Sequence, residues 1–129
     1  DLGRRQLTIV GADAKSEQTR YIDLNREAYT LLVEWQKRWG NYQLVFPNPN
    51  TGEKFDNIKS AWNGLREAAG LKNFRFHDLR HSFASKLVMK GVDLYVVKEL
   101  LGHSSIEMTE RYAHLAPSAR KEAVGRLDG

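Results

Sequence analysis

The sequence predicts a mainly α-helical fold with a small antiparallel β-hairpin near its start, an α+β architecture. Two observations carry this prediction. Gln6–Val10 and Thr19–Leu24 are short, β-prone segments that flank a polar loop. From Asn25 onward, apolar residues recur at helical spacing and glycines interrupt the pattern.

The loop between the two β-prone segments contains Gly11 and places Lys15 near the tip of the expected hairpin. A length of 129 residues fits one domain. We expect this domain to consist of a hairpin over 1–24, a helical core over 25–115 and a tail helix over 116–129.

The first expected helix begins after Asn25, which can cap it, and ends at Gly40. Its apolar face is formed by Ala28, Leu31, Leu32, Trp35 and Trp39. The further expected helices are Asp56–Ala69, His77–Lys90, Asp93–Leu101, a segment capped by Ser104 or Ser105 that runs to Tyr112, and Ser118–Arg126. Glycines at 70, 91 and 102 are placed to end the second, third and fourth helices. In the helix after His77, Phe83 and Leu87 are expected to anchor the core.

Composition narrows the classes of function. The net charge of +4 and the isoelectric point of about 9.4 suit an anionic partner such as nucleic acid. Cysteine is absent, which excludes disulfides and cysteine chemistry and fits a reducing compartment. We see neither a long apolar run that would span a membrane nor the apolar core of a signal peptide.

His77 and Arg80 stand three residues apart, so on a helix they share a face. An arginine fork beside a histidine can bind a phosphate, with the histidine as donor or proton carrier. The alternative is a surface helix whose polar side chains are merely solvated.

His81 completes the pattern H-D-x-x-H, which is close to the zinc-protease pattern H-E-x-x-H. A zinc hydrolase would need Asp78 as its base, although that residue is one methylene shorter than glutamate. It would also need a third ligand, for which His103 is the candidate. The alternative is that His81 packs or caps beside Asp78.

His103 and Tyr112 each have an ordinary structural explanation. His103 follows Gly102 in the joint between two helices, where it could pack in the turn or reach a cleft. Tyr112 lies near the end of a short helix, a position typical of a buried ring with a wet hydroxyl. Its phenol would need cationic neighbours and a base to attack phosphorus, because its ordinary pKa is about 10.

Taken together, the order and spacing of these residues resemble a known family. The segment from His77 to Leu115 is similar to the C-terminal signature of the tyrosine recombinases, or phage-type integrases. The matching motifs are H-x-x-R at His77 and Arg80, L-L-G-H at Leu100–His103, and the tyrosine of R-Y-x-H at Tyr112. The upstream hairpin with Lys15 also resembles that of the family.

The resemblance implies a site-specific DNA recombinase that cleaves and rejoins strands through a 3′-phosphotyrosyl link, with no cofactor and no metal. Tyr112 would be the nucleophile and Arg80 would clamp the phosphate oxygens. Lys15 would protonate the departing 5′-oxygen. His77 would be a base or phosphate ligand, and His103 would bind the phosphate and help to take the phenolic proton.

One part of the family pattern is missing. The family has a further arginine, in a segment resembling T-G-x-R before the hairpin, and residues 1–129 contain no such segment. We expect a fragment truncated at its N-terminus that is inactive or impaired alone, since one lost donor costs about 100- to 1000-fold in rate. The alternative to an enzyme is a DNA-binding remnant of the same fold.

The resemblance also implies partners. These are double-stranded DNA at a specific site and further copies of the chain: a tetramer on DNA, and a monomer or weak dimer without it. The tail after Pro117 could pack in cis or on a neighbouring protomer. A bacterial or phage-derived protein in the cytoplasm, at the nucleoid, is expected. Candidate phosphate contacts are Lys15, Arg20, Lys59, Arg66, Lys72, Arg75 and Lys86.

Overall fold

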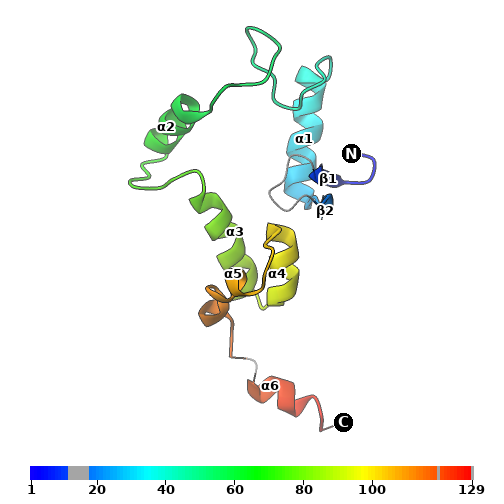
Figure 1. Ribbon diagram of the computed structural model, residues 1–129, viewed down its shortest axis with the longest axis vertical. Coiled ribbons are helices and arrows are strands. Elements are labelled where there is room, and N and C mark those ends of the chain that lie inside the picture. Colours follow the sequence, from blue (N-terminus) through cyan, green and yellow to red (C-terminus); the bar gives the residue numbers. More distant parts are fainter. Residues whose placement is uncertain (12–17, 119, 129) are drawn as a thin grey trace. The chain divides into compact units, whose positions relative to one another are not determined.

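The computed structural model describes residues 1–11, 18–118 and 120–128, with the side chains of 120–122 left out, and it has the expected fold class (Figure 1). Two strands are followed by helices, as predicted. The elements are β1 (Gln6–Ile9), β2 (Arg20–Asp23), α1 (Arg26–Trp39), α2 (Lys59–Ala68), α3 (Asp78–Met89), α4 (Leu94–Leu101), α5 (Glu107–Glu110), the 3₁₀ helix η2 (Ala113–Leu115) and α6 (Arg120–Gly125). Lys15 falls outside the described residues. Within the described ranges, no helix combines the length and apolarity needed to cross a membrane.

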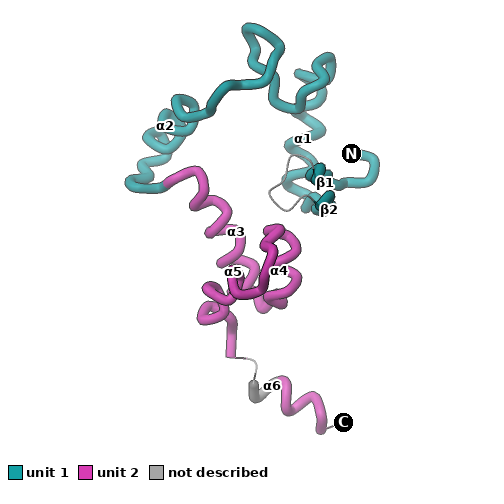
Figure 2. Tube along the Cα trace, in the orientation of Figure 1, with its two compact units in different colours: residues 1–74 teal, residues 75–129 magenta. Residues whose placement is uncertain are grey.

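The chain divides into two compact units, residues 1–74 and residues 75–129 (Figure 2). The first contains the hairpin, α1 and α2, and the second contains α3 to α6. The prediction of one domain over 1–129, with its three parts, stays a prediction. Each unit is therefore described by itself.

The hairpin of the first unit is confirmed. β1 and β2 pair antiparallel, with Gln6 opposite Asp23 and Ile9 opposite Arg20. Beyond the last pair, the main-chain N–H of Gly11 donates to the hydroxyl of Thr19 at 3.0 Å. This side-chain bond extends the pairing into the start of the loop, where a main-chain group would otherwise lack a ladder partner.

Helix α1 begins where its capping residue predicts. The Asn25 side chain accepts a hydrogen bond from the main-chain N–H of Ala28 at 2.8 Å, and Gly40 follows the last helical residue. The expected apolar face is not a buried one, since Leu31 is 64% exposed. Trp35 and Trp39 instead stack on each other, with ring centroids 5.7 Å apart.

Glycines end α2, α3 and α4 as predicted. Gly70, Gly91 and Gly102 have φ values of +66°, +79° and +66°, in the left-handed region that favours glycine after a helix. The predicted start of α2 at Asp56 is wrong, because the helix begins at Lys59. The Asn57 side chain accepts from the main-chain N–H of Lys59 at 3.1 Å, a local bond that favours a turn over an earlier helical start.

The core of the second unit lies between α3 and α4. Ala84 and Val88 of α3 pack with Val97 and Leu101 of α4, and the ring of Tyr112 completes the cluster. Leu87 packs against this core as expected. Phe83 does not, since it is 45% exposed. Residues four apart share a helix face, and the face that α3 buries contains Ala84 and Val88, so Phe83 points about 100° away.

The fifth helix is much shorter than predicted. It covers only Glu107–Glu110, and its N-cap position is Ile106, not Ser104 or Ser105. The Ser105 hydroxyl instead bonds the Glu107 carboxylate and lowers the pKa of that carboxyl. Tyr112 donates its main-chain N–H to the Thr109 carbonyl at 2.9 Å, three residues back, so the chain has tightened to 3₁₀ geometry. Tyr112 therefore lies in the joint between α5 and η2, and not in a helix.

The predicted tail helix exists but is shorter than Ser118–Arg126. It runs over Arg120–Gly125. Pro117 precedes it, as expected for a residue that ends one segment before the next helix begins.

Candidate active site

Four of the five predicted catalytic residues lie in the second unit. His77 is the N-cap residue of α3, and Arg80 is in the first turns of that helix. His103 follows Gly102 at the end of α4, and Tyr112 follows α5. The fifth residue, Lys15, lies outside the described residues, so its place relative to the others is a prediction.

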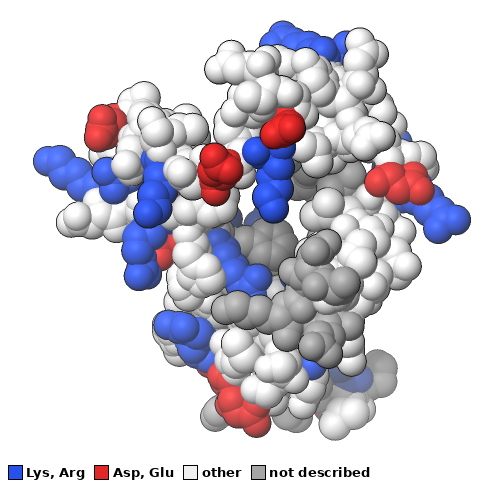
Figure 3. All heavy atoms as spheres, turned by 45° about the horizontal axis from the view of Figure 1, so that its top comes forward, with Lys and Arg blue, Asp and Glu red and all other residues white. Residues whose placement is uncertain are grey.

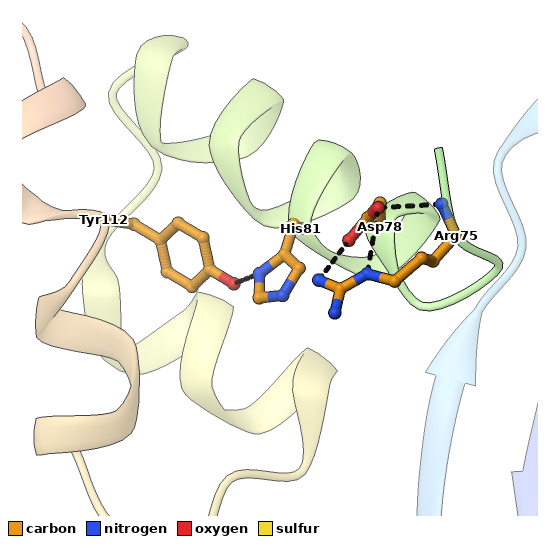
Figure 4. Close-up of polar contacts among 4 residues, drawn as sticks. All are labelled: Arg75, Asp78, His81 and Tyr112. Carbon is orange, nitrogen blue, oxygen red and sulfur yellow. Dashed lines mark hydrogen bonds and ion pairs between the residues drawn. The ribbon is translucent and has the colours of Figure 1, made fainter. Parts of the chain in front are cut away.

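An ion pair organises the first turn of α3. The Arg75 guanidinium donates from Nη2 to Asp78 Oδ1 at 3.0 Å, and the Arg75 main-chain N–H donates to Asp78 Oδ2 at 2.8 Å (Figure 4). These two bonds, the side-chain bond first, hold the pKa of the Asp78 carboxyl below its usual range. Asp78 is thus a carboxylate near the helix N-terminus, where the helix dipole favours negative charge.

Arg80 connects the first half of α3 to the end of α4. Its Nη2 donates to the main-chain oxygen of Leu101 at 2.6 Å. That oxygen belongs to the last helical residue of α4. The bond fixes where the guanidinium lies and places positive charge at a helix C-terminus.

His103 is oriented by a buried threonine. Its Nδ1 lies 2.8 Å from the hydroxyl of Thr109, a residue of α5 with no exposed surface. The left-handed turn at Gly102 brings His103 back from α4 toward α5. The position of the imidazole ring is therefore set by a hydrogen bond and a backbone turn.

Tyr112 is held through its phenol oxygen. The ring is buried, at 6% exposure, and the hydroxyl lies 2.5 Å from Nδ1 of His81 on α3 (Figure 4). The guanidinium of Arg111 lies 5.8 Å from the centre of the Tyr112 ring. Tyr112 thus has a cationic neighbour and a histidine on its phenol oxygen, the kinds of group that attack on phosphorus requires.

His81 is the residue that the sequence prediction missed. It stands next to Arg80 and 31 residues before Tyr112, so no local spacing relates it to the tyrosine. Burial is the first cause that lowers its pKa, followed by the charges of Arg111 and His77. The expectation that His81 packs or caps beside Asp78 therefore omits its main contact, which is with Tyr112.

The zinc alternative receives no geometric support. Across the described residues, no three His, Asp or Glu side chains gather as a metal-binding group. The side chains proposed for it have other contacts: His81 Nδ1 meets the Tyr112 hydroxyl, and His103 Nδ1 meets Thr109. Asp78, proposed as the base, pairs with Arg75.

Surface charge does not by itself mark a DNA-binding face. On the face that Figure 3 shows, acidic side chains lie next to several of the Lys and Arg side chains. Arg75 is already paired with Asp78. The DNA contacts predicted for Arg20, Lys72, Arg75 and Lys86, and for Lys59 and Arg66, stay predictions.

The chain is similar in sequence and in fold to known proteins. The sequence model of the phage integrase family matches residues 1–119. The integrase of Salmonella phage P22 is 37% identical over 99% of this chain and 36% of that protein. The catalytic domain of bacteriophage HP1 integrase superposes with a TM-score of 0.66 at 30% identity, covering 95% of this chain and 64% of that one. A structure of the XerH site-specific recombinase, described as bound to palindromic difH substrate in a post-cleavage complex, superposes with a TM-score of 0.69 at 27% identity, covering 96% of this chain and 36% of that one.

The mainly helical fold with its small antiparallel hairpin is the fold of a recombinase catalytic domain. The chain belongs to the phage integrase family, the tyrosine recombinases. It spans about a third of the length of the curated relatives that it matches, at 36%, 31% and 30% of three of them.

Proposed function

We propose that this chain is the catalytic part of a site-specific DNA recombinase that cleaves a strand with Tyr112 and rejoins it through a 3′-phosphotyrosyl intermediate. The observation that carries the proposal is the contact between the Tyr112 hydroxyl and His81, one residue from Arg80 on α3. The phenol, a proton acceptor and a fixed guanidinium are thus held by one unit of the chain. Membership of the phage integrase family supports the same reaction.

Arg80 and His103 serve the phosphate in this proposal. The guanidinium of Arg80 is positioned by the Leu101 carbonyl, so it can meet developing charge on the phosphate oxygens with little reorganisation. The Thr109 hydroxyl sets the ring of His103, whose Nε2 would hydrogen-bond a phosphate oxygen. His77, at the exposed start of α3, would contact the same phosphodiester.

Lys15 completes the reaction as the acid that gives a proton to the departing 5′-oxygen, on the strength of the resemblance alone. Residues 1–129 contain no T-G-x-R segment. We therefore expect this stretch alone to cleave about 100- to 1000-fold more slowly than a protein that supplies such an arginine.

The partner is double-stranded DNA at a specific recombination site. The XerH relative, solved with its difH substrate, supports DNA as the partner. Phosphate contacts from Arg20, Lys72, Arg75 and Lys86 would contribute affinity that falls with salt. We further propose that four protomers assemble on two sites and that the protein without DNA is a monomer or weak dimer. It would act in the cytoplasm, at the nucleoid.

Covalent capture from genomic DNA tests this function and identifies the recombination site in the same experiment. The longest natural protein that contains this chain is mixed with sheared DNA of its source organism, trapped in denaturant, and the DNA attached to protein is sequenced. We expect attachment at one short sequence, lost in Tyr112→Phe. Specific but wholly non-covalent binding, equal in both proteins, would instead establish a DNA-binding remnant.

A further inference from the structure

The phenol oxygen of Tyr112 has a defined hydrogen-bond partner on another helix. His81 Nδ1 lies 2.5 Å from it, and the two rings are tilted by 47° with centroids 6.0 Å apart. A phenol has one proton, and a neutral imidazole has one nitrogen that can accept it. The geometry therefore allows the phenolic proton to lie on the line between the two atoms (Figure 4).

Both members of this pair are fixed. Tyr112 packs in the core with Ala84, Val88 and Leu101, so its ring cannot turn without disturbing α3 and α4. His81 is a part-buried residue of α3, one turn from the Asp78–Arg75 ion pair. A donor and acceptor held by packing need no reorganisation before a proton moves.

The groups around His81 favour its neutral form, which can accept a proton. The groups around it are the His77 ring, edge-on at 5.0 Å, the Asp78–Arg75 ion pair, and Arg111, whose guanidinium lies near the Tyr112 ring. Burial, Arg111 and His77 lower its pKa, and only Asp78 opposes them. A histidine with a lowered pKa is neutral near pH 7, which is the form that can take a proton.

We propose that His81 accepts the phenolic proton when Tyr112 attacks DNA, an assignment that rests on the proposed function. The Tyr112 oxygen forms a bond to phosphorus as the bond from phosphorus to the 5′-oxygen breaks. The phenolic proton moves to His81 Nδ1, and the 5′-oxygen leaves with a proton from a separate acid, a lysine ammonium. In the rejoining step, the 5′-hydroxyl attacks phosphorus and gives its proton back to the neutral lysine amine. The bond from phosphorus to the Tyr112 oxygen breaks, and His81 returns its proton to that oxygen.

This assignment differs from the one that the resemblance implied. His77 or His103 was expected to take the phenolic proton. His77 is exposed and lies edge-on to His81, while His103 Nδ1 meets the Thr109 hydroxyl. The nitrogen on the phenol oxygen belongs to His81.

The test compares cleavage by wild type, His81→Asn, His77→Asn and Tyr112→Phe in the longest natural protein that contains this chain. The substrate is the captured site with sulfur in place of the bridging 5′-oxygen. Its thiolate leaves without a proton, so the pH profile reports the nucleophile and not the acid. Asn at position 81 retains an acceptor oxygen near the place of Nδ1 but cannot serve as a base.

We expect His81→Asn to cleave about 100-fold or more slowly at pH 7. Its rate should rise continuously with pH, because only phenolate then attacks. Wild type and His77→Asn should both lose rate toward acid pH, at a lower pH than an ordinary histidine would give, because burial lowers the pKa of His81. Should His81→Asn not fold, the wild-type profile decides: a rate that does not fall toward acid pH anywhere in the range in which the protein stays folded overturns the assignment.

Failure of the assignment to His81 can be distinguished from failure of the proposed function. If Tyr112→Phe is inactive while His81→Asn cleaves at the wild-type rate with the wild-type pH profile, the proton goes elsewhere and the proposed function survives. If wild type forms no covalent product, the proposed function fails and the assignment to His81 fails with it.

Discussion

The guanidinium of Arg80 donates from Nη2 to the main-chain oxygen of Leu101 at 2.6 Å, and so joins α3 to the last residue of α4. Leu101 belongs to the buried core, and the next two residues are Gly102 and His103. One hydrogen bond thus connects the proposed phosphate clamp to the turn that positions the second phosphate ligand. We expect changes on either side of it to affect stability and cleavage together.

Arg80→Lys should lower both the stability of the fold and the rate of cleavage. An ammonium cannot present the planar fork of a guanidinium, so we expect cleavage to fall about 100-fold or more. Loss of the bond to Leu101 should reduce the free energy of unfolding by about 1–2 kcal/mol. Covalent capture and urea unfolding measure the two effects, with Arg38→Lys on α1 as the control. Equal capture by Arg80→Lys and wild type would remove Arg80 from the site.

Thr109→Val should impair His103 without opening a cavity, because valine nearly matches threonine in shape. The imidazole loses the hydroxyl on Nδ1, and we expect cleavage to fall about tenfold to 100-fold as the ring loses its orientation. Thr109→Ser retains the hydroxyl and should restore most of the rate, although it costs about 1 kcal/mol for the buried methyl group. A serine variant as slow as the valine variant would argue for packing over orientation.

Gly102→Ala and Gly70→Ala form a matched pair, because both glycines have φ of +66°. Each alanine should cost about 1 kcal/mol of unfolding free energy from left-handed strain, measurable by thermal denaturation. Around Gly70, no atom lies within 4 Å of an added Cβ, so that variant should cleave normally. Only Gly102→Ala should slow cleavage, since the next residue is His103. Equal cleavage by the two variants would contradict this role for the turn.

Protonation of His81 should destabilise the fold. Its pKa is lowered in the folded chain, first by burial and then by Arg111, so the unfolded chain binds more protons between the two values. The contribution of neutral His81 to stability is therefore fully present above the pKa of the unfolded chain, about 6.5. It is lost as the pH falls from there through the lower pKa of the folded chain. Between pH 7.5 and 5.5, the free energy of unfolding measured in urea should fall less for His81→Asn than for wild type. An identical loss in the two proteins would indicate that His81 does not titrate in this way.

The fold class and the order of elements could be predicted because their signals are local. Asn25 caps α1, and glycines end the later helices, through backbone preferences that act within one turn. The fifth helix could not be predicted, since Ser105 resembles a cap but bonds Glu107, and the chain tightens to 3₁₀ geometry before Tyr112.

The site was predictable only in part for a related reason. Motif spacing identified Tyr112 and Arg80 as candidates, but it says nothing of contacts between residues far apart in the chain. His81 meets Tyr112 across 31 residues, and Arg80 meets Leu101 across 21. Such contacts depend on how α3 packs against α4 and the segment after α5, which only the three-dimensional structure gives.

Peptide mapping of the covalent protein–DNA product tests most directly whether Tyr112 is the nucleophile. After capture and nuclease digestion, trypsin should release residues 112–120, because it cleaves after Arg111 and after Arg120. We predict a nucleotide attached through its 3′-phosphate to Tyr112, located by fragmentation in the mass spectrometer. A nucleotide on any other residue, or strand cleavage whose ends carry no protein, would contradict the account.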